Sequence, residues 1–255
     1  MGQVMDGETG LPASFELAWG VRERPTRGPK RALSLERVVA AGVAVAAGEG
    51  IGAVSMSRVA KELGTSAMAL YRYVASKDEL IALMVDSALG DAPDLSAGLV
   101  GPDGWRAGLE RWAWNELAAY RRHKWVLQVP ITGPPVTPKS IAFLEQGLRC
   151  LAGTPLEPHE KMSVILTLTS YTRSWATLSA QIDAALAAGD PAATHVLTNY
   201  GAILGALTDP ADFPALHEVL AADVFTPEED PTDEDFVFGL ARLMDGFAVL
   251  INSRT

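Results

Sequence analysis

The side chains best suited to chemistry lie in one short stretch, residues 66–77, which mixes aromatic, cationic and hydroxyl groups. On a helix of 3.6 residues per turn, four of them are left on the outward face: Ala67, Met68, Tyr71 and Arg72. A helix face of this kind can meet the edges of bases in the major groove of DNA. The stretch therefore predicts recognition of nucleic acid, a chemistry in which no covalent bond is made or broken.

Patterns that would indicate catalysis or metal binding are absent from the sequence. Its histidines have neither His-Glu-x-x-His nor Glu-x-x-His spacing, no Gly-x-Ser-x-Gly elbow occurs, and no glycine-rich phosphate loop precedes a lysine. The single cysteine, Cys150, excludes an internal disulfide and a multi-cysteine zinc site, so we expect a buried thiol. We therefore expect no enzyme, no metal and no other cofactor.

Charge is distributed unevenly along the chain, although the net charge is −10. Residues 20–77 carry ten Lys and Arg against four Asp and Glu, a local charge of +6, whereas residues 91–255 carry eleven against twenty-one. Cationic side chains supply much of the affinity for DNA because they neutralise phosphates and release counterions. A basic front end on an acidic body favours a nucleic-acid-binding segment near the N-terminus.

Short helices with clear start signals are predicted between residues 34 and 90. The residues that would cap their N-termini are Ser34, Ser55, Thr65 or Ser66, and Ser76. Gly64 can adopt the left-handed backbone of a tight turn, and Glu79 completes a capping box with Ser76. Two short helices around a glycine turn are typical of the helix-turn-helix motif, whose second helix enters the major groove.

This region resembles the TetR family of bacterial regulators. The resemblance is carried by VSMSRVAKELG at residues 54–64, MALYRYV at 68–74 and SKDEL at 76–80. Further along, GWR at 104–106 and RHKW at 122–125 look like a C-terminal domain found in many actinobacterial members. The resemblance implies an all-α fold, with an N-terminal three-helix helix-turn-helix DNA-binding domain and a C-terminal helical-bundle domain for ligand binding and dimerisation.

The same resemblance implies a function. It implies a homodimeric transcriptional repressor that occupies a palindromic operator on double-stranded DNA and is released by a small hydrophobic effector. An activator, or a ligand-independent regulator on the same fold, stays open as the alternative.

Carried over position by position, the family pattern assigns roles to individual residues. It places Ala67, Met68 and Tyr71 at bases, and Tyr73 and Lys77 at phosphates, with Ser66 and Arg72 as further candidates. Because the first two offer only apolar contact, for example to thymine methyl groups, Arg72 is the candidate for polar readout. Core packing is the alternative for Tyr73, and a solvated position is the alternative for Lys77.

Domain boundaries follow from composition. Residues 1–33, rich in Gly and Pro, indicate a flexible basic arm; 34–90 form the DNA-binding domain, and 91–255 the helical ligand-binding and dimerisation domain. Cations of the arm, including Arg27 and Arg31, are expected in a minor groove, where narrow A·T tracts attract arginine. A solubilising tail is the alternative.

Long amphipathic segments dominate the rest of the chain. Helices are predicted at about 104–125, 138–151, 158–188, 191–206 and 233–253. A ligand pocket in such a bundle would be apolar and aromatic with a few polar groups, and Arg173 could also orient a ligand. The candidate ligand-binding residues are Trp105, Trp112, Phe143, Tyr171, Trp175, His195 and Asn199, with core packing as the alternative for the aromatic ones.

Two of these helices, 158–186 and 233–253, lie where the family builds its dimer interface. The second carries an apolar stripe of Phe236, Leu240, Leu243, Phe247 and Leu250. No run of 18 apolar residues occurs, and the first thirty residues lack the order of a signal peptide. We therefore expect a cytoplasmic protein with no membrane partner.

Overall fold

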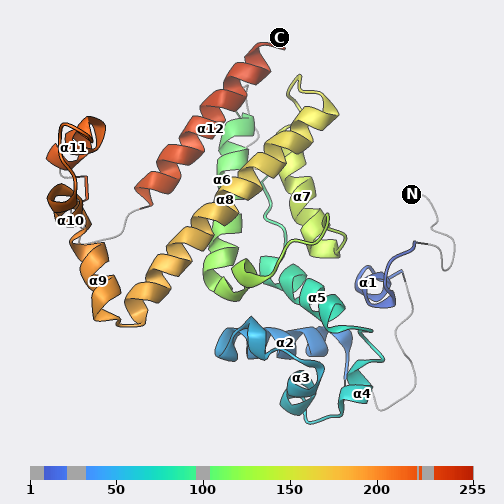
Figure 1. Cartoon of the computed structure of the whole chain (residues 1–255). Coiled ribbons are helices and arrows are strands. Elements are labelled where there is room, and N and C mark those ends of the chain that lie inside the picture. Colours follow the sequence, from blue (N-terminus) through green and yellow to red (C-terminus); the bar gives the residue numbers. More distant parts are fainter. Residues whose placement is uncertain (1–8, 22–32, 96–103, 223, 226–232, 255) are drawn as a thin grey trace. The chain divides into compact units, whose positions relative to one another are not determined.

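The computed structural model describes residues 9–21, 33–95, 104–222, 224–225 and 233–254, in which every regular element is a helix (Figure 1). The N-terminal elements are α1 (Ala13–Ala18), α2 (Leu35–Glu49), η1 (Ile51–Ala53), α3 (Met56–Glu62), α4 (Ala67–Leu70) and α5 (Lys77–Leu89). The later ones are α6 (Gly104–Arg122), η3 (Lys124–Gln128), α7 (Pro138–Cys150), α8 (Pro158–Ala187), α9 (Pro191–Thr198), α10 (Tyr200–Leu207), α11 (Pro214–Ala221) and α12 (Glu234–Asn252). The predicted all-α class is confirmed, and no described helix is long and apolar enough to cross a membrane.

The chain divides into two compact units, and the helices α8 and α12 contribute residues to both. The first unit contains residues 1–176 and 243–255, with the N-terminal helices, α6 and α7. The second contains residues 177–242, with α9, α10 and α11. Nearly all of the buried apolar side chains belong to the first unit, whereas α9, α10 and α11 have no buried residue.

Three of the four predicted helix starts are confirmed by side-chain hydrogen bonds, and Ser66 precedes α4 without one. The hydroxyl groups of Ser34, Ser55 and Ser76 each accept from the backbone N–H three residues later, at 3.3, 3.1 and 3.1 Å. The Glu79 carboxylate accepts in return from the backbone N–H of Ala75, at 2.9 Å. These bonds satisfy donors that the first turn of a helix leaves unpaired. The glycine turn is also confirmed, because Gly64 has a φ of 63°.

The helices α2 and α5 form the scaffold of the DNA-binding domain. Val38, Leu80 and Met84 are fully buried in this domain, and Gly42 of α2 faces Met84. A Cβ atom at Gly42 would come within 2.6 Å of the Met84 sulfur, which no real structure tolerates without a shift. The glycine therefore sets how closely the two helices approach.

The prediction that residues 1–33 form a flexible arm is wrong for residues 13–18. Residues 13–18 form the helix α1, which packs against α5 and buries Phe15 and Ser14. The Ser14 hydroxyl donates to the Glu79 carboxylate at 2.6 Å, and the Trp19 indole N–H donates to the carbonyl of Val136 at 2.9 Å. Burial of the phenyl ring gives this short segment a stabilisation that its composition does not indicate. The cations Arg27 and Arg31 lie outside the described residues.

Two further differences lie in the second unit. The helix predicted at 191–206 is broken at Asn199, whose side chain donates to the carbonyl of His195 at 2.9 Å. Asparagine side chains compete with backbone groups for hydrogen bonds, which explains the break at this residue. The helix α11, which begins with Pro214 in its first turn, was not predicted.

Two glycines of α2 give a matched test of this packing. Gly42→Ala should lower the free energy of unfolding by about 1–3 kcal/mol, because the new methyl group overlaps the buried Met84 side chain. Gly48→Ala meets no atom within 4 Å and should raise it by about 0.5 kcal/mol, because alanine loses less backbone entropy in a helix. Chemical denaturation measures both changes. Equal effects of the two substitutions would contradict the close approach of α2 and α5.

Candidate functional site

The surface of α4 exposes the side chains that the sequence predicts to face outward. Met68 is 74% exposed and Tyr71 48% exposed, and Arg72 is exposed at the end of the helix. Ala67 is half-buried, while Leu70 on the opposite face is fully buried. The face offers an apolar side chain, a phenol and a guanidinium, which are groups that can meet a thymine methyl and polar base edges.

An ion-pair cluster joins α2 to α3 and holds the first helix of the motif. The Arg58 guanidinium donates to Glu49 of α2 at 3.0 Å and to Glu62 of α3 at 2.9 Å. The hydrogen bonds that Arg58 donates to these carboxylates raise its pKa further, and the bond from Arg58 lowers the pKa of Glu49. Two carboxylates thus neutralise this cation, so Arg58 orients α3 and contributes little to the positive potential for DNA.

The residues predicted to face phosphates lie in two different environments. Lys77, in the first turn of α5, and Ser66, before α4, are exposed and free to approach a ligand from solvent. Tyr73 is half-buried, and its hydroxyl donates to the carbonyl of Leu33 at 3.0 Å. This bond ties the end of the motif to the residue at which the basic N-terminal segment joins the DNA-binding domain. Contact of these residues with DNA stays a prediction.

Two of the predicted ligand-binding aromatic residues pack against each other in the first unit. The Trp112 and Phe143 rings stack with centroids 4.8 Å apart, and the Trp112 indole N–H donates to the Phe143 carbonyl at 2.8 Å. Gly147 of α7 lies against the same indole, so α6 and α7 are in close contact. Trp105 is also buried. These side chains pack in the core of the C-terminal domain, and their contact with a ligand stays a prediction.

The other predicted ligand-binding residues are more accessible. Tyr171 and Trp175 are half-buried, one helical turn apart on α8. In the second unit, the side-chain nitrogen of Asn199 lies 3.2 Å from Nδ1 of His195, which is exposed. These two side chains therefore form a hydrogen bond with each other. Their contact with a ligand stays a prediction.

The first unit contains a buried polar cluster around Glu116, a residue that the sequence analysis did not identify. Glu116 of α6 is 3% exposed; its Oε1 accepts from the Tyr120 hydroxyl at 3.0 Å, and its Oε2 is enclosed without a well-formed hydrogen bond. The Thr172 hydroxyl of α8 is likewise buried without a partner. The spacing could have revealed this cluster, because Glu116 interrupts an apolar face formed by Leu109, Trp112 and Tyr120.

Burial dominates the electrostatics of this cluster. It raises the pKa of Glu116 to about 8, against the opposing effects of the Tyr120 hydrogen bond and the positive charge of Arg173. Burial also raises the pKa of Tyr120. The carboxyl group is therefore mostly protonated at neutral pH and can donate a hydrogen bond through its second oxygen.

The single cysteine of the chain is not set up as a nucleophile. Cys150 is buried as predicted, its Sγ donates to the carbonyl of Gln146 at 3.3 Å, and burial raises its pKa to about 11. A thiol that stays protonated at neutral pH is a poor nucleophile. Among the described residues, no three His, Cys, Asp or Glu side chains are grouped so that they could hold a metal ion.

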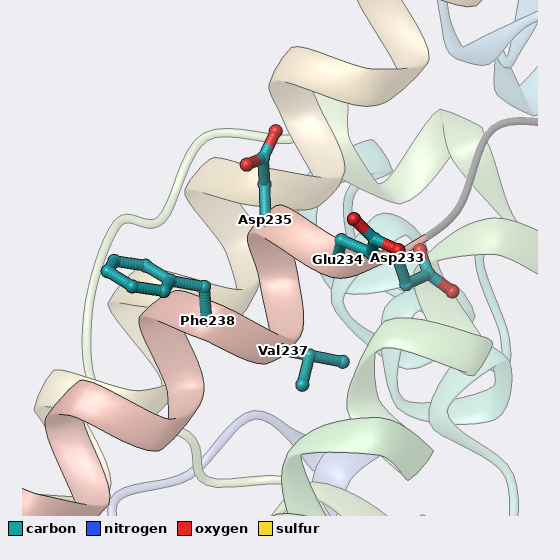
Figure 2. A pocket seen from close by; sticks show the side chains of 5 residues that line it. All are labelled: Asp233, Glu234, Asp235, Val237 and Phe238. Atoms are coloured by element: carbon teal, nitrogen blue, oxygen red, sulfur yellow. The ribbon is translucent and has the colours of Figure 1, made fainter. Parts of the chain in front are cut away.

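A surface hollow at the start of α12 is not a ligand pocket. It is lined by Asp233, Glu234, Asp235, Val237 and Phe238, whose side chains fan out around the helix in Figure 2 and do not converge. Neighbouring residues of a helix are turned by about 100° from one another, so one turn cannot enclose a ligand.

The predicted apolar stripe of α12 is not free for a second subunit, and that expectation is wrong for its first members. Phe236 and Leu240 are buried within the chain, and Leu243, Phe247 and Leu250 are partly covered. The apolar side chains that α12 exposes are Val237, Phe238 and Val249. The sequence pattern identifies an apolar helix face but cannot distinguish packing within a chain from packing between chains.

Comparisons with known proteins agree along the whole chain. Residues 38–84 match the family described as "Bacterial regulatory proteins, tetR family", and residues 97–251 match the "Tetracyclin repressor-like, C-terminal domain". Over 263 residues, which cover 97% of this chain and 89% of the relative, the sequence is 36% identical to the HTH-type transcriptional repressor DrrR1 of Streptomyces coeruleorubidus.

Solved structures of one family protein show the same fold at low sequence identity. The TetR family protein ActR of Streptomyces coelicolor in complex with actinorhodin has a TM-score of 0.74 at 20% identity, covering 88% of this chain and 100% of that one. ActR in complex with (S)-DNPA has a TM-score of 0.69 at 20% identity, covering 86% and 98%. These likenesses extend over both the N-terminal helices and the C-terminal domain.

Replacement of the buried acid tests the electrostatics of the cluster. The unfolded chain loses the Glu116 proton near pH 4.3 and the folded chain near pH 8, so ionisation destabilises the fold increasingly between these values. Relative to Glu116→Gln, the wild-type free energy of unfolding should therefore fall as pH rises, by at most about 1.4 kcal/mol per pH unit. Urea titrations at several pH values measure this. Parallel curves, as expected for the exposed control Glu145→Gln, would contradict it.

Proposed function

Because this chain belongs to the TetR family of bacterial regulatory proteins, we propose that it is a repressor that binds a palindromic operator as a homodimer and is released by a small hydrophobic ligand. The observation that carries the proposal is the exposed face of α4, which two N-capped helices and the Gly64 turn present to solvent. A rigid recognition helix is what base readout in the major groove needs.

Individual residues of this surface support the proposal by their chemistry. Met68 and Ala67 are suited to apolar contact with thymine methyl groups, and Tyr71 and Arg72 to polar base edges. We propose that Lys77 and Ser66, which are exposed, meet phosphates, which position the protein on the duplex without reading sequence. We propose further contacts from the cations Arg27 and Arg31, whose local excess of positive charge favours DNA.

A ridge along α8 supports the homodimer. Met162, Leu166, Ser170 and Ser174 are all exposed and follow one another every four residues. In the second unit the same spacing continues along the helix with Leu178, Ile182 and Leu186, which are also exposed. Ridges of this spacing interdigitate when two helices cross, and the two serines leave room for close approach at the centre of the ridge. We propose that α8 crosses its symmetry mate there.

The interior of the C-terminal domain supports a small effector. Its aromatic side chains include Trp112 stacked on Phe143, and Glu116 and Thr172 are buried polar groups, which is the mixture of groups found in most ligand sites. ActR, whose fold this chain shares, binds small molecules in two of its structures. A ligand releases DNA only if it binds the released state more tightly than the bound one.

The proposal predicts specific, salt-sensitive binding to the DNA upstream of the chain's own gene. In gel-shift titrations the affinity should fall steeply as salt rises, because phosphate contacts release counterions. Footprinting should show two half-sites related by a two-fold axis, with centres separated by ~34 Å or a multiple of it. Salt-insensitive binding, or protection of a single half-site, would refute the dimeric repressor.

Two substitutions separate base contact from phosphate contact. Tyr71→Ala should weaken operator binding more than binding to unrelated DNA, because the lost contact reads a base. Lys77→Ala should weaken both and reduce the slope of log affinity against log salt by about 1. Fluorescence anisotropy with operator and scrambled duplexes measures the four affinities. If both variants lost equal affinity for both duplexes, the assignment of these residues would be wrong.

A further inference from the structure

We propose that Arg173 is the positioning residue that couples the interior of the C-terminal domain to the DNA-binding domain, by holding the short helix η3 in place. The inference rests on the proposed function, since it describes how occupation of the C-terminal domain would reach the recognition helix. It assigns to Arg173 a role in transmission of the signal in addition to any contact with a ligand.

The outer side of Arg173 holds the end of η3. Its Nη2 donates to the carbonyl groups of Val126, Leu127 and Val129, at 3.2, 3.3 and 2.7 Å. These carbonyls lie at the C-terminal end of η3, where a positive charge is favoured by the helix dipole, and the Val126 carbonyl also accepts from the backbone N–H of Val129 at 3.1 Å. One guanidinium from α8 therefore fixes a turn of chain more than forty residues away in sequence.

The helix η3 lies between this arginine and the DNA-binding domain. Within the first unit it contacts both α2 and η1, and it buries Trp125 and Val126. The helix α2 in turn packs against α3 and α5, which position α4. A shift of η3 would therefore act on the scaffold that presents Tyr71 and Arg72.

The inner side of Arg173 faces the buried polar cluster. Its guanidinium carbon lies 5.7 Å from the centroid of the Tyr120 ring, and the hydroxyl of that ring donates to Glu116. The cation thus lies between the neutral carbonyls of η3, to which it donates, and the cluster around Glu116, whose Tyr120 ring it faces. A hydrogen bond to an ionised carboxylate is stronger than one to a neutral carbonyl, so ionisation of Glu116 would draw the cation inward.

The open hydrogen-bonding position on Glu116 is where a ligand would act. Oε2 of Glu116 is buried without a well-formed bond, and such an atom favours any ligand group that satisfies it. A ligand group bound there would change the charge or the position of Glu116 and Tyr120. The hydrogen bonds from Arg173 to η3 would then strengthen or weaken. A switch requires two states, and here they would be η3 bound by Arg173 and η3 released from it.

Amide hydrogen exchange and DNA binding of the full-length chain test the proposal. Arg173→Met keeps the length of the side chain but removes the donors, so exchange over residues 124–129 should speed up about tenfold. Operator affinity should fall by about fivefold or more, while affinity for unrelated DNA stays unchanged. Arg173→Lys, which retains one charge but not the planar fork, should give intermediate values. The control is Arg149→Met, on an exposed arginine of α7 that pairs with Glu145 and should behave as wild type.

The outcomes separate this inference from the proposed function. A folded Arg173→Met protein with wild-type exchange and wild-type operator affinity would overturn the inference, as would equal losses for operator and unrelated DNA. If Arg173→Met does not fold, wild-type exchange over 124–129 in Arg173→Lys would overturn it. If the wild-type protein binds no operator, the proposed function fails, and the exchange measurement still decides whether Arg173 holds η3.

Discussion

The close approach of α2 and α5 at Gly42 is the contact on which the recognition surface depends. The helices of the motif are short, with seven residues in α3 and four in α4. Helices of this length are not stable alone in water. They persist because Val59 and Leu70 are buried in the domain that α2 and α5 frame. The outward direction of Tyr71 is therefore a consequence of packing on the other side of the motif.

The helix α5 belongs to the DNA-binding domain and also anchors the C-terminal domain. At its start, Glu79 accepts the hydroxyl of Ser14 from α1. Near its end, the Asp86 carboxylate accepts from the backbone N–H of Ser140 at 2.8 Å, in the first turn of α7. Thr137, the residue that precedes α7, makes no such bond, so α5 supplies the cap that α7 lacks. The bond between Asp86 and Ser140 thus joins the two domains at a helix end, and such a bond is directional and breaks over a short displacement.

The interior of the C-terminal domain contains polar groups that lower the stability of the fold. An acid and a hydroxyl left without full hydrogen bonding are costly in an apolar core, and a hydrophobic pair would pack there at lower cost. A bound molecule that formed hydrogen bonds with these groups would offset that cost. The acidic surface of the rest of the chain restricts attraction for DNA to the basic front end.

The sequence by itself determined the features that depend on neighbours in the chain. Serine caps, the glycine turn, helical periodicity and the family motif are local signals, and they placed α2 to α5 and the outward set of α4. The burial of Glu116 could also have been predicted, because its position on an apolar helix face follows from the spacing of the residues.

Only the tertiary structure decided the features that depend on distant residues. The bond from Trp19 spans 117 residues and the bond from Ser14 spans 65, so the order of α1 could not follow from its own composition. The same holds for the pairing of Arg173 with η3 and of Tyr73 with Leu33. Such contacts form when the chain folds back on itself, and their energy depends on which surfaces meet, which periodicity within one segment does not specify.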